Sequence, residues 1–265
     1  MHNLSLDQIV LFGDSITQHS FNPVIQGWGA ILADAYMRRL DVVNRGFSGY
    51  NTEWCKHVLA DTLASTLPAS GASRTPQIKL MTLFLGANDA VLPEKNQRQP
   101  VAIPQYKANL LEMLATVKSM SPDTRVVIIT PPPVDPLRWH EKCKLKGKEG
   151  DREVGYTKLY RDACLEVGIE AKKTWGSALQ VVDIWEVFFG KGQTEYTMDD
   201  VADLLSDGLH LAARGNTLLA AALLKTIKES WPELNPEIVK PRVTFNEQVD
   251  KTKLPDILFK NYDDY

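Results

Sequence analysis

The order of apolar runs along the chain is the feature that most limits its fold. Five runs rich in Val, Ile and Leu show little alternation with polar residues, as is typical of strands buried on both faces: residues 8–13, 40–46, 78–86, 125–133 and 179–185. Segments with apolar positions at helical spacing lie between and after them, at residues 27–40, 53–67, 106–120, 155–175 and 214–231. Because parallel strands need crossover connections, this alternation predicts a single α/β domain whose mainly five-stranded parallel sheet carries helices on both faces.

Composition and charge limit the classes of function. The 265 residues include 30 Lys and Arg against 33 Asp and Glu, and this net charge of −3 argues against a bulk attraction to nucleic acid or to an anionic membrane. No stretch approaches the roughly 20 apolar residues of a membrane span, and the first residues lack the basic and apolar regions of a signal peptide. The three cysteines have no metal-binding spacing and predict free thiols. We therefore expect a cytoplasmic protein.

Two segments fit the alternating pattern less well. Residues 138–152 form a basic, turn-rich insert after the fourth predicted strand, where the active-site loops of open sheets gather. The tail at 232–265 contains prolines that prevent one continuous helix, yet it keeps apolar residues between positions 243 and 259. We therefore expect a main domain at 1–231 and an arm at 232–265, which packs on this domain or on the partner subunit of a homodimer.

Polar residues follow the predicted strands at the edge where an open parallel sheet binds its ligands. The tripeptide Gly-Asp-Ser at 13–15 follows the first strand, the glycine-rich stretch 44–51 follows the second, and Asn88 follows the third. An aspartate and a histidine three residues apart, Asp207 and His210, precede the last predicted helix. Each of these stretches alone is equally well explained as a turn or a helix cap. Together they bring a hydroxyl, an amide, a carboxylate and an imidazole to one rim.

This set of groups matches the needs of acyl transfer. A serine hydroxyl is a poor nucleophile unless an adjacent base removes its proton. Of the histidines, only His210 has a carboxylate three residues earlier, so we expect Asp207 to hold one imidazole nitrogen while the other faces Ser15. The oxyanion then needs donors, and the backbone N–H groups of Ser15 and Gly46 with the side-chain amide of Asn88 would suffice.

The blocks FGDSIT, NRGFSGYN, FLGAND and SDGLHL, taken in this order, resemble the four sequence blocks of the SGNH, or GDSL-type, hydrolases. The resemblance implies a flavodoxin-like, three-layer α/β/α sandwich and an enzyme that needs no cofactor. It also implies Ser15 as the nucleophile, His210 as the base and Asp207 as the carboxylate that orients it. The implied oxyanion hole consists of Ser15, Gly46 and Asn88.

Within this family the sequence is most similar to the isoamyl-acetate-hydrolysing esterases, on the stretches RGFSGYNTEW, LFLGANDA, PPPVDPLRW and LLSDGLHL. The similarity implies hydrolysis, by water, of small acetate or other short-chain esters. Val134 and Trp139 are candidates for lining the acyl or alcohol pocket, although such residues often only pack. Thioesterase, lysophospholipase and carbohydrate acetylesterase activities stay open, because the same catalytic residues serve them. A non-catalytic protein that binds a phosphate at the same rim is the alternative from another class, and it would not need Asp207 and His210.

Neighbouring side chains are rivals for these roles. His19 is an alternative base, although no carboxylate follows it at a suitable helical offset. Asp203 could replace Asp207 as the orienting carboxylate if the helix geometry differed. Asp14 is expected to be a hydrogen-bonding partner in the turn rather than a second acid. No cluster of His, Asp and Glu has the spacing of metal ligands, so we expect no metal site.

Overall fold

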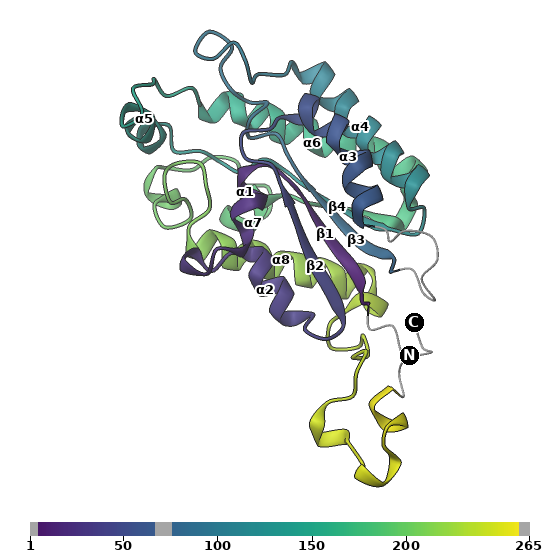
Figure 1. Cartoon of the computed structure of the whole chain (residues 1–265). Helices are drawn as coiled ribbons and strands as arrows, with labels where there is room; N and C mark the ends of the chain where they lie inside the picture. The colour runs from purple at the N-terminus through teal and green to yellow at the C-terminus, as the bar shows by residue number, and fades with distance from the viewer. Residues whose placement is uncertain (1–4, 67–75, 260–265) are drawn as a thin grey trace.

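A single sheet organises the structure, a computed structural model that describes residues 5–66 and 76–259. Its five strands are all parallel and lie in the order β2-β1-β3-β4-β5 (Figure 1). The strands are β1 (Asp7–Gly13), β2 (Leu40–Gly46), β3 (Ile78–Phe84), β4 (Arg125–Ile129) and β5 (Leu179–Val182). This order is that of the flavodoxin-like folds, so the predicted fold class is confirmed.

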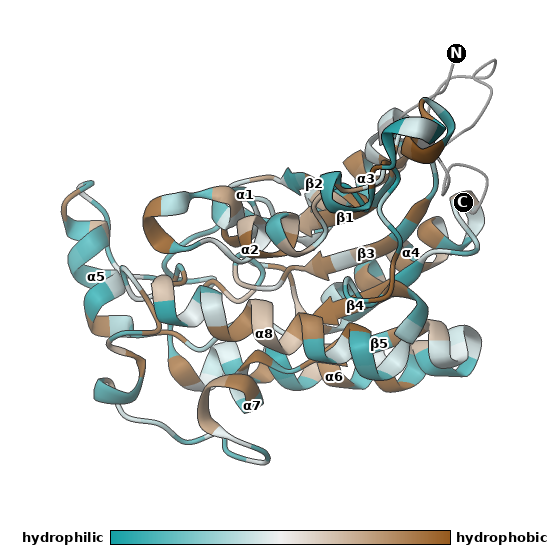
Figure 2. Cartoon of the chain, turned by 90° about the horizontal axis from the view of Figure 1, so that it is seen from below, coloured by the Kyte–Doolittle hydropathy of each residue, from teal (hydrophilic) through white to brown (hydrophobic). Residues whose placement is uncertain are grey.

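Burial on both faces explains why the strands lack a polar alternation. In β1, Ile9 and Leu11 pack on one side of the sheet, Val10 and Phe12 pack on the other, and all four are buried. Apolar side chains dominate the strands, whereas the surrounding helices mix apolar and polar residues (Figure 2). The first face is covered by α2 (Trp28–Ala35), α7 (Ile184–Phe189) and α8 (Ala213–Ser230). The second face is covered by α3 (Thr52–Thr66), α4 (Ile103–Met120) and α6 (Val154–Trp175).

The insert after the fourth strand contains a helix that the sequence analysis did not predict. Helix α5 (Pro136–Lys144) begins with the side chain of Asp135, which accepts from the backbone N–H groups of Leu137 and Arg138. A proline at the first helical position suits this start, because its missing N–H would have no partner there. The helix is hydrophilic over most of its length (Figure 2), and its few apolar residues are too sparse to stand out as a helical pattern in the sequence. The expectation of a turn-rich loop was therefore wrong for the first half of the insert.

Short helical turns complete the fold. Helix α1 (Ser15–Gln18) directly follows β1. The remaining turns are 3₁₀-helices: η1 (His19–Phe21), η2 (Pro23–Ile25), η3 (Gly176–Ala178), η4 (Asp199–Val201), η5 (Pro232–Leu234), η6 (Asn246–Gln248), η7 (Lys251–Lys253) and η8 (Asp256–Phe259).

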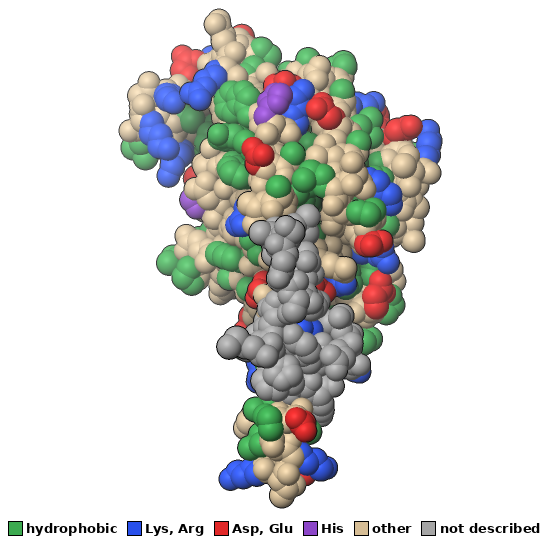
Figure 3. Space-filling model, turned by 45° about the vertical axis from the view of Figure 1, so that its right-hand side comes forward, with side chains coloured by type: hydrophobic (Ala, Val, Ile, Leu, Met, Phe, Trp, Pro, Cys, Tyr) green, Lys and Arg blue, Asp and Glu red, His purple; other side chains and the backbone are tan. Residues whose placement is uncertain are grey.

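The tail contacts the main body through its first part. The hydroxyl of Tyr36 donates to the carbonyl of Leu234 (2.7 Å), and Arg38 Nη2 donates to the carbonyls of Val243 (2.9 Å) and Thr244 (2.8 Å). Beyond these contacts the chain runs away from the sheet (Figure 1), and this part of the tail forms a projection at the bottom of the space-filling view (Figure 3). Leu254 in this part is 49% exposed rather than buried. Residues 260–265 of the predicted arm lie outside the described residues.

The helices and the cysteines can be compared with the expectations from composition. Within the described parts of the chain, no helix is long and apolar enough to cross a lipid bilayer. Cys55, Cys143 and Cys164 are buried and free, as predicted.

Candidate active site

The candidate site lies where the sheet changes its direction of winding. Ser15 follows β1 and the loop with Asn88 follows β3, and these neighbouring strands mark the switch point at which flavodoxin-like sheets bind ligands. A cleft of about 330 Å³ opens there, with Ser15, Gly49, Asn88, Trp139 and His210 among its lining residues. A larger hollow of about 940 Å³ lies at the amino ends of the strands, but no histidine or cysteine lines it.

The turn after β1 presents Ser15 to the cleft. An added Cβ at Gly13 would lie 2.3 Å from Thr17 Oγ1 and 2.4 Å from the Phe84 carbonyl oxygen, so only glycine fits between β3 and α1. Asp14 caps α1 by accepting from the Ile16 N–H (2.9 Å), as expected for a partner in the turn. Ser15 is the first residue of α1, so its own N–H has no acceptor within the helix.

His210 links Ser15 to a carboxylate. Its Nε2 lies 2.8 Å from Ser15 Oγ, and its Nδ1 lies 3.0 Å from Asp207 Oδ2. Burial alone would raise the pKa of Asp207, but the side chain and charge of His210 and the backbone N–H groups of His210 and Leu209 lower it to about 2. Asp207 is therefore ionised at neutral pH. An imidazole held in this way can accept the serine proton while the carboxylate stabilises the imidazolium that forms.

The rival residues lie elsewhere or face away from these roles. Asp203 forms an exposed ion pair with Arg214 (2.6 Å) and does not contact His210. The His19 ring stands edge-on to the His210 ring, with 5.8 Å between centroids, and His19 is exposed. Of the predicted carboxylates, the structure brings only Asp207 to the imidazole among the described residues.

The structure contradicts Gly46 as a donor to the oxyanion. Its N–H donates to Asn44 Oδ1 (2.9 Å), and an added Cβ would lie 2.0 Å from the backbone nitrogen of Gln18. Gly46 is thus required for the close packing of β2 against α1. Three residues later, Gly49 lines the cleft with a φ of +81°, a conformation that favours glycine. Within the described residues, the N–H of Gly49 has no protein acceptor, so it is available to a ligand.

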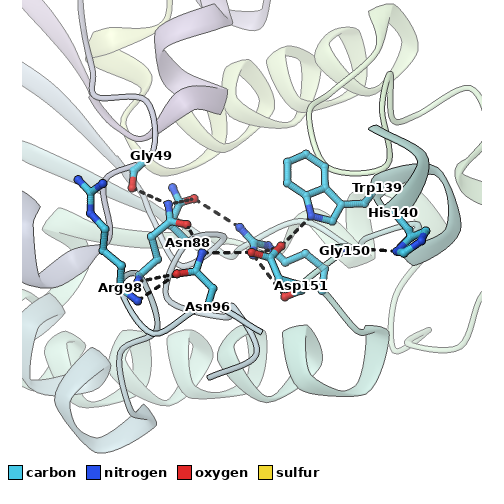
Figure 4. A network of polar contacts seen from close by, with 10 residues as sticks. Gly49, Asn88, Asn96, Arg98, Trp139, His140, Gly150 and Asp151 are labelled. Carbon is cyan, nitrogen blue, oxygen red and sulfur yellow. Dashed lines mark hydrogen bonds and ion pairs between the residues drawn. The ribbon is translucent and has the colours of Figure 1, made fainter. Parts of the chain in front are cut away.

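A set of hydrogen bonds fixes the orientation of the Asn88 side chain (Figure 4). Its Nδ2 donates to the Tyr50 carbonyl (2.8 Å), which leaves the second N–H of this amide for a ligand. Its Oδ1 accepts from Gln99 Nε2 (3.3 Å) and lies 3.5 Å from Arg152 Nη2. Because Oδ1 faces two donors, the amide cannot turn over without losing both contacts.

Asp151 connects this amide to the wall of the cleft. Its Oδ1 accepts from Trp139 Nε1 and from Arg152 Nη1, both at 2.8 Å, and its Oδ2 accepts from Asn96 Nδ2 at 3.2 Å (Figure 4). Gln99, Asp151 and Arg152 were not predicted as site residues. They lie in loops, and no motif or regular spacing in the sequence marks them. Only the basic character of the insert pointed towards Arg152.

The two candidates for the substrate pocket have different positions. Trp139 lines the cleft and packs against His210, with 6.1 Å between ring centroids, so its contact with substrate stays a prediction. Val134 is 1% exposed and belongs to the core. Its backbone N–H and carbonyl bond the hydroxyl of Tyr196 at 3.0 and 2.7 Å. Val134 does not line the cleft, and its assignment to the pocket was wrong.

Two buried aspartates lie beneath the site. Burial raises the pKa of Asp14 to about 6, against the opposing effects of the Ile16 N–H and the charges of His210 and Arg152. Burial likewise raises the pKa of Asp89 to about 7, although Thr52 hydrogen-bonds this carboxylate through its hydroxyl and its N–H. Neither carboxylate lines the cleft. Among residues 5–66 and 76–259, no group of three or more His, Cys, Asp or Glu side chains is arranged to hold a metal ion.

Comparison with known proteins identifies the family. The model of the GDSL-like lipase/acylhydrolase family matches residues 11–218, a span that begins in β1 and ends in α8. The chain belongs to this family. It is thus a member of a family of carboxylic ester hydrolases, as the four sequence blocks predicted.

Relatives of this GDSL-type hydrolase include proteins named after one ester. The chain is 38% identical to an isoamyl acetate-hydrolyzing esterase 1 homolog of Rattus norvegicus, over 87% of this chain and 82% of the relative. It is 30% identical to an isoamyl acetate-hydrolyzing esterase of Saccharomyces cerevisiae, over 88% of this chain and 91% of the relative. The crystal structure of a lipase/acylhydrolase from Enterococcus faecalis has the same fold, with a TM-score of 0.59 and 24% identity over 90% of this chain and all of the other.

Proposed function

We propose that this GDSL-type hydrolase cleaves small esters of short-chain carboxylic acids, such as isoamyl acetate, through an acyl-enzyme on Ser15. The observation that carries the proposal is the 2.8 Å contact between His210 Nε2 and Ser15 Oγ, with Asp207 on the other imidazole nitrogen. The names of the rat and yeast relatives support the choice of ester. A cleft of about 330 Å³ is at the small end for ligand sites, which favours a small substrate.

The first step forms the acyl-enzyme. His210 Nε2 accepts the proton of Ser15 Oγ, and this oxygen attacks the carbonyl carbon of the ester. The negative charge that develops on the carbonyl oxygen is stabilised by the N–H groups of Ser15 and Gly49 and by the free N–H of Asn88. His210 then gives its proton to the leaving alcohol as the bond between the carbon and the alcohol oxygen breaks.

The second step releases the acid. A water molecule takes the place of the alcohol, and His210 accepts one of its protons while its oxygen attacks the acyl carbon. The same three donors hold the second oxyanion. When the bond to Ser15 breaks, His210 returns the proton to Oγ, and the carboxylic acid leaves.

The test is hydrolysis of p-nitrophenyl acetate and of isoamyl acetate by the purified protein. Ser15→Ala and His210→Ala should each lower kcat by several orders of magnitude, because residues of such a set act as a unit. A series of esters from acetyl to palmitoyl should show a steep fall of kcat/KM with acyl length. Full activity of the Ser15→Ala variant would refute the proposed nucleophile, and a preference for palmitoyl esters would refute the proposed substrate size.

A further inference from the structure

One wall of the cleft carries an excess of positive charge, although the whole chain has a net charge of −3. This wall consists of the end of α5 and the segment that follows it, residues 142–152. It contributes four cationic side chains to the lining of the cleft that also contains Ser15: Lys142, Lys146, Lys148 and Arg152. Lys148 also lines an adjoining hollow of about 350 Å³, together with Arg98.

The acidic side chains of this wall do not balance its lysines. Glu149 pairs with Lys95 at 2.6 Å, and Asp151 is held by Arg152 and by the indole of Trp139. Within the described parts of the chain, the side chains of the three lysines in the cleft form no ion pair with a carboxylate. Three positive charges are therefore left for a ligand, next to the groups that surround the ester.

Arg152 lies at the base of the wall, paired with Asp151. Its side chain is 2% exposed, its Nη1 bonds Asp151, and its Nη2 reaches Asn88 Oδ1 at 3.5 Å. The Nε of this guanidinium is buried and has no hydrogen-bond partner among the described residues. Arg152 and Asp151 form a buried ion pair that is close to neutral as a unit, so the excess of positive charge in the cleft comes from the three lysines.

Backbone contacts hold the wall in place. The Leu92 N–H donates to the carbonyl of Asp151 (3.0 Å), the Gly150 N–H donates to His140 Nδ1 (3.2 Å), and the Lys146 and Lys148 N–H groups both donate to the carbonyl of Cys143. The contact of Gly150 with His140 appears in Figure 4. The lysines are thus carried by a segment tied at both ends, and their charges stay at the cleft.

We infer that the preferred ester of this enzyme carries an anionic group, such as a carboxylate, in its acyl or its alcohol part. The inference rests on the proposed esterase function and narrows its substrate class. The anion would lie along the 142–152 wall while the ester carbonyl lies at Ser15. Complementary charge of this kind speeds encounter and lowers KM, and both effects weaken as salt is added.

The test compares pairs of esters that differ in charge but hardly in shape. For the alcohol part, para-acetoxybenzoate is compared with para-acetoxybenzamide, and for the acyl part, monoethyl malonate is compared with ethyl malonamate. Each kcat/KM is divided by the rate of alkaline hydrolysis of the same ester at high ionic strength, where the repulsion between hydroxide and the carboxylate is screened. At low salt, the corrected kcat/KM of the anionic ester should exceed that of the neutral ester about tenfold or more in at least one pair. This ratio should fall towards one as salt screens the charges.

Variants link the preference to the wall. The triple variant Lys142→Gln, Lys146→Gln, Lys148→Gln should bring the anionic-to-neutral ratio close to one. The matched control is the triple variant Lys144→Gln, Lys172→Gln, Lys173→Gln, which changes the net charge equally. Lys144 lies on the same helix outside the cleft, and the other two lie on α6, so the control should keep the preference.

The outcomes separate this inference from the proposed function. If Ser15 is needed for hydrolysis of the neutral esters, but the anionic-to-neutral ratio of kcat/KM is at or below one in both pairs, the inference is overturned and the proposed function stands. A preference that survives in the cleft triple variant, or disappears equally in the control, would also overturn it. If the Ser15→Ala variant matches the unmodified enzyme on every ester, the proposed function fails, and the inference fails with it.

Discussion

The side-chain amide of Gln99 donates to Asn88 Oδ1 across 3.3 Å, and this contact helps to decide which way the Asn88 amide faces. Gln99 Nε2 also bonds the carbonyl of Gly49 at 2.9 Å. One side chain thereby holds the two loops that supply two of the three proposed oxyanion donors. We interpret Gln99 as a positioning residue for the oxyanion hole.

Replacing Gln99 by methionine should lower kcat about tenfold, with little change in KM, because Asn88 would lose a fixed orientation that matters most in the transition state. The measurement is steady-state hydrolysis of p-nitrophenyl acetate. Gln105→Met is the matched control, since Gln105 bonds Asn109 on α4, away from the cleft. If Gln99→Met changes only the melting temperature, the contact is structural and the interpretation is wrong.

Removing the Asn88 amide should lower kcat more than removing its contact with Gln99. Asn88→Ala should lower kcat by roughly 10²–10³, the usual loss for one oxyanion donor, and should leave KM nearly unchanged. The same assay measures it. Unaltered kcat in this variant, with activity still abolished in Ser15→Ala, would mean that the amide is not a donor although the nucleophile is correct.

The two candidate carboxylates can be compared directly. Asp207→Ala should lower kcat by several orders of magnitude, yet leave more activity than Ser15→Ala, because the imidazole loses only its orientation and the stabilisation of its charge. Asp203→Ala removes an exposed ion pair with Arg214 and should leave kcat unchanged. Equal losses in the two variants would contradict the assignment of Asp207.

The raised pKa of Asp14 predicts a dependence of stability on pH. Its folded-state pKa is about 6 against an ordinary value of 3.8, so between these values the folded chain keeps a proton that the unfolded chain has lost. The free energy of unfolding contributed by this group therefore falls as the pH rises through this window. Asp14→Asn removes the titration and keeps an acceptor for the Ile16 N–H. The stability of this variant relative to the unmodified protein should rise by about 3 kcal/mol between acidic and neutral pH, as measured by urea unfolding. A difference that does not vary with pH would contradict the prediction.

Two truncations test the arm. A chain that ends at Phe245 keeps the hydrogen bonds of Arg38 to Val243 and Thr244, so its melting temperature should fall by less than about 2 °C. A chain that ends at Asn235 loses these bonds and the contact of Arg39 with Val239, and its melting temperature should fall by at least about 5 °C. Light scattering gives the mass of each chain. A dimer of the full chain that becomes a monomer on truncation would show that the arm joins subunits. Constant monomer mass with a lower melting temperature would show that it packs on its own body, and no change in either would show a loose tail.

The sheet and the larger helices could be predicted because burial leaves a strong mark on sequence. The run at 40–46 coincides with β2, and the other strands lie within their predicted runs or extend them by one residue. The central strands β1, β3 and β4 are covered on both faces and are mostly apolar, whereas the edge strand β2 is only partly buried. Helix α5 could not be predicted in the same way. Its residues are mostly polar or charged and its apolar residues are few, so the Asp135-Pro136 start is its clearest mark in the sequence.

Part of the site could also be predicted from the sequence, and part could not. The approach of Ser15, Asp207 and His210 could be anticipated, because a short local spacing and the rule for strand ends determine it. The choice between Gly46 and Gly49 could not, because the two glycines lie three residues apart at the end of β2 and only the backbone conformation decides which N–H faces the cleft. Contacts such as that of Arg152 with Asn88 join separate loops, so they could not be predicted from a pattern in the sequence.

The contact between Ser15 and His210 joins residues that are 195 positions apart in the chain. During synthesis the histidine is therefore added long after the serine. A partly made chain has a sheet edge and a hydroxyl but nothing to remove its proton, so it is chemically inert towards esters. The appearance of hydrolysis during refolding of the complete chain would accordingly mark the docking of the loop before α8 against the turn after β1.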